Sequence, residues 1–309
     1  MCNHMNIRYR AAVAASSIRN AFQARRPQVS LITDFGIGDE AAYAVKSAIH
    51  AVNPRAVVDE ICHNVPVGNI IVGASRLRRA VMLPTERPGT VYVAVVDPGV
   101  GTSRKDIIVK TKTGKYLVGP DNGVLSLAFS SEGVERAVEV ENPSLTLLHL
   151  AHSRTFRGKD VFAPVAGHLL RGVPISEFGR SIDENDLARI SISCETSEKG
   201  RAGYIVDVDG FGSIRTNVPN HLPESVIGTS VDFVIHGKRT VSSSATVART
   251  FSDVEKGEPA LVLSSTGCLD LAVNLGSASE RYGIRAEDIG IRNSEPDTRI
   301  SLSYAQNAR

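Results

Sequence analysis

The chain has 309 residues, which fits about two domains better than a single core. Hydrophobic residues make up 42% of the sequence and charged residues 22%, as in ordinary globular proteins. The net charge of +2 favours no class of partner. Five arginines and no acidic residue fall within residues 1–29, so the rest of the chain has a slightly negative net charge. The sequence therefore does not indicate a basic surface for binding nucleic acid. No apolar run reaches about 18 residues, so we predict no membrane span.

The cysteines are scattered along the sequence without any Cys-x-x-Cys pair (Cys2, Cys62, Cys194 and Cys268). This spacing fits neither a zinc site nor a disulfide framework, so we expect free thiols in a reducing cytoplasm and no bound metal. Residues 1–27 are rich in arginine and poor in acids. They are either a disordered upstream extension or an organellar targeting segment, and the second alternative would change the expected compartment.

Strand-like and helix-like segments alternate from residue 28. Asp39 is suited to cap the start of the first helix, and Asn53 followed by Pro54 ends it. Alternation of this kind predicts a parallel sheet with helices on both faces. The expected order is a strand at 29–32, a helix at 39–52, a strand from 56 to about 62, a helix at 70–83 and a strand at 90–96.

Further elements continue this domain. Short strands are expected at 107–109 and 116–118, and residues 120–123 form a tight turn. A helix at 159–170 buries a stripe of apolar side chains and ends at Gly172. We therefore predict a Rossmann-like α/β sandwich domain over residues 28–192.

The character of the sequence changes near residue 195. Residues 195–200 are polar and rich in turn formers, which is typical of a linker. Short alternating strands separated by glycine-bearing turns follow, and no long amphipathic helix occurs before Ser277. This pattern predicts a small β-barrel domain over residues 198–295. Residues 296–309 are polar, and we expect them to form a flexible tail.

Polar side chains follow three of the predicted strands, where each strand ends. These are Asp34, His63 and Asp97. In α/β sheets, ligands bind beyond the carboxyl ends of the strands, so we expect a site there. The glycine-containing turn after Asp97 can bring Arg104 back to that carboxylate, which would keep it ionised. The alternative is a surface turn with an ordinary ion pair.

Six segments resemble, in order, those of the S-adenosylmethionine hydroxide adenosyltransferases, relatives of the S-adenosylmethionine-dependent fluorinase and chlorinase. The resemblance covers about residues 28–292. It implies an α/β domain followed by a β-barrel, and a homotrimer with active sites between subunits. The segments are 31–36, 95–104, 119–126, 155–164, 209–213 and 265–273.

The resemblance also implies the chemistry. Family members attack the ribose C5′ of S-adenosylmethionine and expel methionine. Asp97 matches the family's catalytic aspartate and Arg104 its arginine. A carboxylate beside the line of attack repels halides, so Asp97 favours water as the nucleophile, and water needs a base. Asp34 matches the aspartate that holds the ribose hydroxyls.

Other positions match substrate-binding residues of the family. Phe156 and Phe251 match aromatic residues around the nucleoside, and core packing is the alternative for both. Asp209 matches the residue that binds the methionine ammonium group, with an Asp-Gly turn as its alternative. The remaining matches are a polar pair, Ser265 and Asp270, and Val273, whose backbone would meet the adenine. For these three the alternative is an ordinary surface strand.

Two residues depart from the family's pattern. Arg157 stands where the family has a histidine that completes the catalytic group, and arginine cannot exchange a proton near neutral pH. Arg157 can still orient water by donating hydrogen bonds, and His152 is an alternative proton carrier. Ser213 stands where the family has an asparagine that pairs with adenine, which predicts altered nucleobase binding.

Three functions are compatible with these residues. The first is hydrolysis of S-adenosyl-L-methionine to adenosine and L-methionine, with Asp97, Arg104 and Arg157 as the catalytic group, no cofactor, and a small molecule as the only partner besides other subunits. The second is a protein that binds adenosine or S-adenosylmethionine with little catalysis. The third is a halide-using enzyme, which two arginines favour and Asp97 disfavours.

Overall fold

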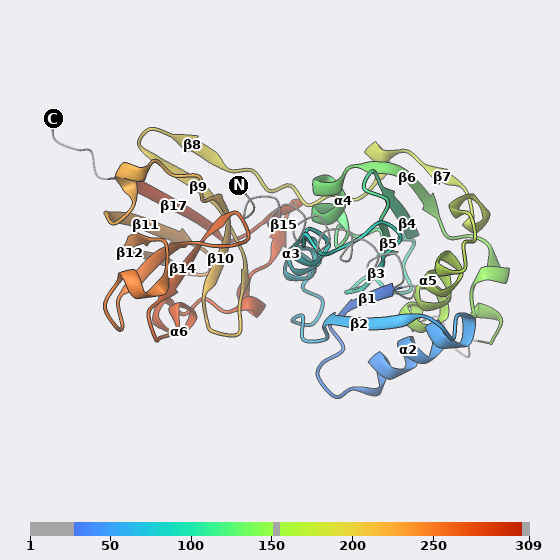
Figure 1. The fold of residues 1–309 in the computed structure, drawn as a ribbon. Helices are drawn as coiled ribbons and strands as arrows, with labels where there is room; N and C mark the ends of the chain where they lie inside the picture. The colour runs from blue at the N-terminus through green and yellow to red at the C-terminus, as the bar shows by residue number, and fades with distance from the viewer. Residues whose placement is uncertain (1–27, 151–154, 305–309) are drawn as a thin grey trace, which may run out of the picture.

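The computed structural model describes residues 28–150 and 155–304, which form two domains side by side (Figure 1). The first is a mixed α/β domain around a seven-stranded sheet with the order β2-β1-β3-β5-β4-β6-β7. The second contains a closed seven-stranded barrel. The described helices include none that is both long and apolar enough to cross a membrane.

The first sheet is only partly parallel. Strands β2, β1, β3 and β5 run parallel, whereas β4, β6 and β7 are antiparallel to their neighbours. The short turn between β4 and β5 leaves no room for a crossover helix, so these strands form a hairpin. The strands are β1 (Gln28–Thr33), β2 (Val57–Cys62), β3 (Val91–Val95), β4 (Asp106–Thr111), β5 (Tyr116–Pro120), β6 (Val134–Glu139) and β7 (Ser181–Ile182).

Helices cover both faces of this sheet, as predicted. The apolar sides of α2 and α5 share a buried cluster with one face, and α3 and α4 share another with the opposite face. Asp39 caps α2 by accepting a hydrogen bond from the Ala41 amide at 2.8 Å, which confirms that expectation. The helix α4 was not anticipated. The helices are α2 (Glu40–Val52), α3 (Ile70–Val81), α4 (Ser126–Glu132) and α5 (Ala163–Leu170).

The barrel closes because β9 pairs with both β17 and β10. Several of its strands, such as β10 and β11, alternate buried and exposed side chains, and the buried ones belong to a core that also includes Ile71 and Ala74 of α3. A short helix, α6 (Ala278–Tyr282), is the first α-helix after residue 195. The barrel strands are β9 (Gly200–Val208), β10 (Ile214–Pro219), β11 (Ser230–His236), β12 (Thr240–Ala248), β13 (Pro259–Leu263), β14 (Cys268–Val273) and β17 (Arg299–Tyr304).

Two expectations about the second domain are wrong. Residues 195–200 are not a plain linker, because β8 (Glu195–Ser197) pairs with the start of β9 as a hairpin. The expected flexible tail contains β17, which lies between β11 and β9. Its side chains Ile300 and Leu302 are buried, and this alternation was the missed signal. Residues 1–27 and 305–309 lie outside the described residues.

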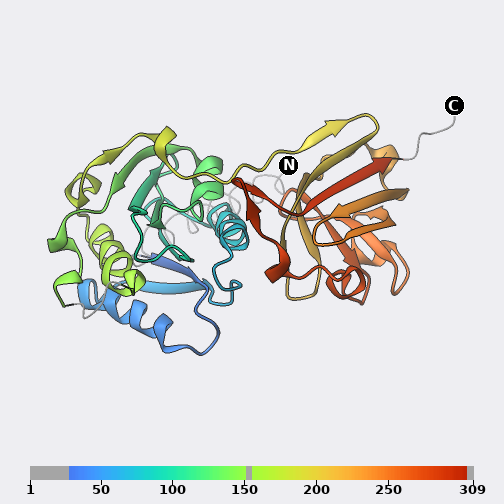
Figure 2. The same cartoon turned by 180° about the vertical axis from the view of Figure 1, so that it is seen from behind.

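The two domains meet along α3, as Figure 2 shows from behind. Ile71 and Ala74 on this helix belong to the same buried cluster as the barrel core. The side chain of Asn69, which caps α3, donates hydrogen bonds to the carbonyls of Ala286 and Ile289 at 3.0 and 2.7 Å. The α3 helix therefore packs against its own sheet and against the barrel.

Candidate active site

Two of the three polar residues that follow the predicted strands line the same cleft. Asp34 follows β1 and Asp97 follows β3, and these strands are neighbours in the sheet. A cleft of about 340 Å³ is lined by both aspartates and by Phe156 and Arg157. The structure therefore has a cleft at the carboxyl ends of these strands, where a site was expected.

His63 does not join this group. Its Nδ1 lies 2.8 Å from the Thr33 hydroxyl, and its Nε2 lies 3.4 Å from Glu60. It lines a neighbouring groove together with Glu60 and Lys46. Among the described residues no group of histidine, cysteine or acidic side chains is arranged to hold a metal ion.

A hydrogen bond from the loop before α3 fixes the carboxylate of Asp34. Its Oδ2 accepts a hydrogen bond of 2.7 Å from the amide of Gly68, which has a φ of +67°. Burial raises the pKa of Asp34 above 3.8, and the nearby charge of Asp97 acts in the same direction, while the Gly68 amide opposes both. A second carboxylate in a partly buried cleft favours a positively charged ligand.

Asp97 and Arg104 form the two-point ion pair that their spacing predicted. Arg104 donates from Nε to Asp97 Oδ1 at 2.9 Å and from Nη2 to Oδ2. The two side chains are only 6% and 11% exposed. The turn between them requires Gly101, whose φ is +84°. The paired geometry fixes the direction of the carboxylate.

The structure adds a residue that sequence analysis missed. Asp106, the first residue of β4, is 3% exposed and accepts hydrogen bonds from Arg104 on one oxygen and from Arg157 on the other. Asp97, Arg104, Asp106 and Arg157 thus form a continuous chain of alternating charges, which we call the four-residue ion network. Its local signal, an aspartate at the start of a strand, is too common to identify it.

Phe156 lies at the wall of the cleft and is not simply core. Its ring packs edge-on against Phe35 with centroids 5.7 Å apart, and the Lys159 ammonium lies 5.8 Å from its centre. Arg157 comes just before a π-helical turn, Gly158–Phe162, that leads into α5. Burial and the charge of Arg104 lower the pKa of Arg157. His152 lies outside the described residues.

The barrel residues with predicted roles lie outside the cleft of Asp97. Asp209 accepts hydrogen bonds of 2.9 Å from the amides of Phe211 and Ser213, so it does form the Asp-Gly turn that was its alternative. Its other oxygen pairs with Arg215 at 3.0 Å, and Arg215 also pairs with Asp270 at 3.1 Å. Burial raises the pKa of Asp270, which Arg215 opposes.

The other three barrel positions differ in exposure. Phe251 is 52% exposed, in a short turn after β12, so core packing does not explain it. Ser265 is exposed in the loop between β13 and β14, and Val273 is buried at the end of β14. No barrel residue in the described part of the chain lines the cleft of Asp97. One chain therefore holds the predicted site residues in two separate groups.

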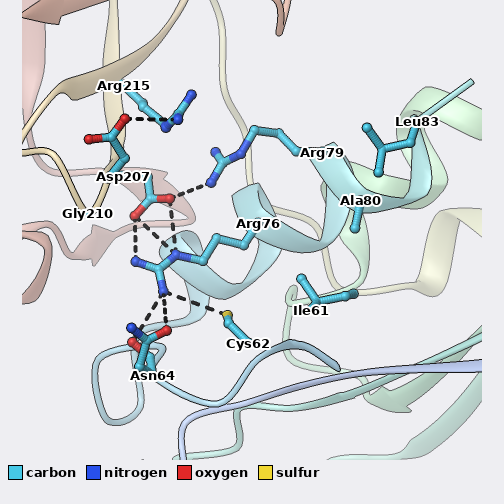
Figure 3. A pocket seen from close by; sticks show the side chains of 11 residues that line it. Ile61, Cys62, Asn64, Arg76, Arg79, Ala80, Leu83, Asp207, Gly210 and Arg215 are labelled. Carbon is cyan, nitrogen blue, oxygen red and sulfur yellow. Dashed lines mark hydrogen bonds and ion pairs between the residues drawn. The ribbon is translucent and has the colours of Figure 1, made fainter. Parts of the chain in front are cut away.

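A second pocket of about 390 Å³ lies between α3 and the barrel (Figure 3). Arg76 and Arg79 extend from α3 to the buried carboxylate of Asp207 on β9, and Arg76 also reaches Asn64 and Cys62. Asp207 is 2% exposed at its side chain. This cluster joins the domains and was not predicted from the sequence.

Comparison with known proteins identifies the family. The model of the SAM hydroxide adenosyltransferase N-terminal domain matches residues 29–179, and that of the C-terminal domain matches residues 203–289. The chain belongs to this family. The two matched regions correspond to the α/β domain and to the barrel.

Relatives and solved structures agree with this family. A protein of Salinispora arenicola named (R)-S-adenosyl-L-methionine hydrolase is 35% identical over 86% of this chain and 97% of its own length. A fluorinase of Nocardia brasiliensis is 26% identical over 85% of this chain and 95% of its own. A crystal structure of a conserved protein from Thermotoga maritima has a TM-score of 0.78 at 34% identity and covers 89% of this chain and all of that chain.

The structure also shows the surroundings of Arg157 and Ser213, the two residues that depart from the pattern expected for this family. Arg157 is anchored to a buried carboxylate, so its guanidinium is fixed at the cleft. Ser213 is 6% exposed, and its amide is tied to Asp209.

Proposed function

We propose that this protein hydrolyses S-adenosyl-L-methionine to adenosine and L-methionine at the cleft around Asp97. The observation that carries the proposal is the pairing of Asp97 with Arg104 at the end of β3, which leaves a fixed carboxylate facing a cleft that also holds Asp34. The names of the relatives, (R)-S-adenosyl-L-methionine hydrolase, support it.

The geometry supports a single displacement. A water oxygen forms a bond to the ribose C5′ as the C5′–S bond breaks, and the sulfur keeps the electron pair and becomes the neutral thioether of methionine. Asp97 takes the proton that water loses. Arg157, which cannot take a proton, donates hydrogen bonds that orient the water. The sulfonium is already a good leaving group, so we propose that neither a metal nor another cofactor takes part.

Substrate binding uses both domains. Asp34 would accept hydrogen bonds from the ribose hydroxyls, and Phe156 would contact the nucleoside. Asp209 would bind the methionine ammonium group. The adenine and the rest of the substrate would meet the other barrel positions with predicted roles, Ser213, Phe251, Ser265, Asp270 and Val273.

We further propose that these barrel residues come from a second subunit, in a homotrimer with sites between subunits. Within one chain they lie outside the cleft of Asp97, which supports this arrangement. The parallel strands whose ends carry Asp34 and Asp97 support a Rossmann-like α/β sandwich. The cysteines that the structure describes are unpaired, which supports the cytoplasm as the compartment.

Product analysis tests the proposal. The protein is incubated with S-adenosyl-L-methionine, with and without chloride, and the products are separated by chromatography. We expect adenosine and methionine in equal amounts in both samples. Unchanged substrate that is nevertheless bound would support a binding protein, which the replacement of the family's histidine by Arg157 favours. A halo-nucleoside would show a halide-using enzyme. Either result overturns the proposal.

An Asp97→Asn variant tests the role of the carboxylate. Asparagine keeps the shape of the side chain but cannot accept the proton, so kcat should fall by roughly 10²- to 10⁴-fold. Asp59→Asn, on the exposed side of β2, is the matched control and should leave kcat unchanged. An Asp97→Asn enzyme with full activity would assign the base elsewhere.

A further inference from the structure

Asp106 is a buried carboxylate that binds Arg157, a residue of the cleft lining, and the proposed mechanism does not use it. Its side chain is 3% exposed, and its two oxygens are engaged separately by Arg104 and Arg157. The backbone holds it in place, because Asp106 pairs with Pro120 on β5 and its carbonyl accepts a hydrogen bond of 2.8 Å from Val140. The carboxylate is therefore fixed between the two guanidiniums.

The position matters because of the charges around it. In the four-residue ion network, two carboxylates face two guanidiniums, so the formal charges cancel. Arg104 and Arg157 lie close enough for each charge to disfavour the other. Asp106 offsets that repulsion. Asp97 and Asp160 also act on the charge of Arg157, but Asp106 is the carboxylate that contacts it. Without Asp106, the positive charge of this guanidinium at the cleft would be less compensated, and it would attract small anions more strongly.

We propose that Asp106 is a specificity-determining residue, which anchors Arg157 at the cleft and cancels its charge, so that the site accepts water and not a halide. This inference rests on the proposed hydrolysis. Arg157 keeps further N–H groups that can donate to a water oxygen, because only one of its terminal nitrogens is engaged by Asp106. A neutral water binds to hydrogen-bond donors alone, whereas binding of a halide is strengthened further by a net positive charge.

The test is an Asp106→Asn variant in a chloride series at constant ionic strength. Hydrolysis by the wild type should not depend on chloride. In the variant, chloride should compete with water and inhibit hydrolysis at concentrations roughly tenfold or more below the highest one that leaves the wild type unaffected, because one opposing charge is removed at close range. Asp121→Asn is the matched control: this partly buried aspartate follows β5, contacts none of the network, and its loss should leave chloride without effect.

A second measurement does not depend on turnover. The linewidth of the chloride NMR signal reports chloride exchange at the protein. It should broaden with Asp106→Asn and with Asp106→Ser, which leaves space for water if asparagine strains the fold. It should return to the wild-type value in the double variant Asp106→Asn/Arg157→Met, which has lost both charges.

The outcomes separate the two proposals. Broadening in the single variants and its loss in the double variant support the role of Asp106 even if the wild type fails to hydrolyse S-adenosyl-L-methionine, in which case only the proposed function fails. Folded single variants whose linewidth and chloride response equal those of the wild type overturn the inference, whatever the activity. A wild type that itself binds chloride at this site overturns it as well.

Discussion

Replacing Asp207 with alanine should destabilise the protein more than most single changes, because this carboxylate joins the two domains. It accepts hydrogen bonds from Arg76 at 3.0 and 3.1 Å and also from Arg79. The Asp207 side chain is 2% exposed, while those of Arg76 and Arg79 are 16% and 24% exposed. Burial lowers the pKa of Arg79 and the charge of Asp207 opposes this, so the arginine depends on its partner.

The size of the effect follows from these exposures. Removing one partner of a buried ion pair costs about 3–5 kcal/mol, because the other charge stays buried and unpaired. The arginines keep some contact with solvent, which favours the lower end, about 3 kcal/mol. For a chain of this size a urea m-value of about 3 kcal/mol per M is expected, so this corresponds to a decrease of about 1 M in the unfolding midpoint.

Urea unfolding followed by circular dichroism measures this change. Asp232→Ala is the matched control, because Asp232 lies exposed on β11 of the same barrel, and its replacement should change stability by less than about 0.5 kcal/mol. A double variant with Arg79→Met should recover part of the loss, because it removes one of the unpaired charges. If Asp207→Ala behaves like Asp232→Ala, the ion pairs of Asp207 contribute nothing to stability and this prediction is wrong.

Three further changes test other parts of the structure. Gly119→Ala would place a Cβ 2.7 Å from the carbonyl oxygen of Ala94, so it should cost about 1–3 kcal/mol in urea unfolding, whereas Gly210→Ala meets open space and should cost much less. Burial raises the pKa of Asp34, so the folded state protonates this carboxylate at a higher pH than the unfolded state does. The stability of the wild type relative to Asp34→Asn should therefore increase as the pH falls from that raised pKa to 3.8. A relative loss over this range would refute the assignment. Arg157→His should lower kcat/KM by about tenfold or more through loss of a charge-assisted hydrogen bond to its buried carboxylate partner, and an increase would show that arginine is a defect at this position.

The sequence determined the features that depend on neighbours along the chain. The cap of α2 by Asp39 and the buried stripe of α5 need only local spacing, and both are present. The pairing of Asp97 with Arg104 also follows from a short turn that contains a glycine. Asp34 and Asp97 were expected at one edge of the sheet because the carboxyl ends of parallel strands meet there.

Features that join distant segments were decided by the tertiary structure. Asp106 and Arg157 are 51 residues apart, and Arg76 and Asp207 are 131 apart, so no local pattern pairs them. The last strand of the barrel was mistaken for a tail because its outward-facing residues are polar, although it completes the barrel between two other strands. Periodicity along a chain reports which face of a segment is buried, but the partner of that face is chosen only when the whole chain packs.

The proposed hydrolysis depends on one carboxylate, that of Asp97. Sequence spacing brings Asp97 and Arg104 together, and folding adds the buried Asp106, which also binds Arg104. If adenosine soaked into crystals of the protein binds away from Asp97, the assignment of this cleft is wrong.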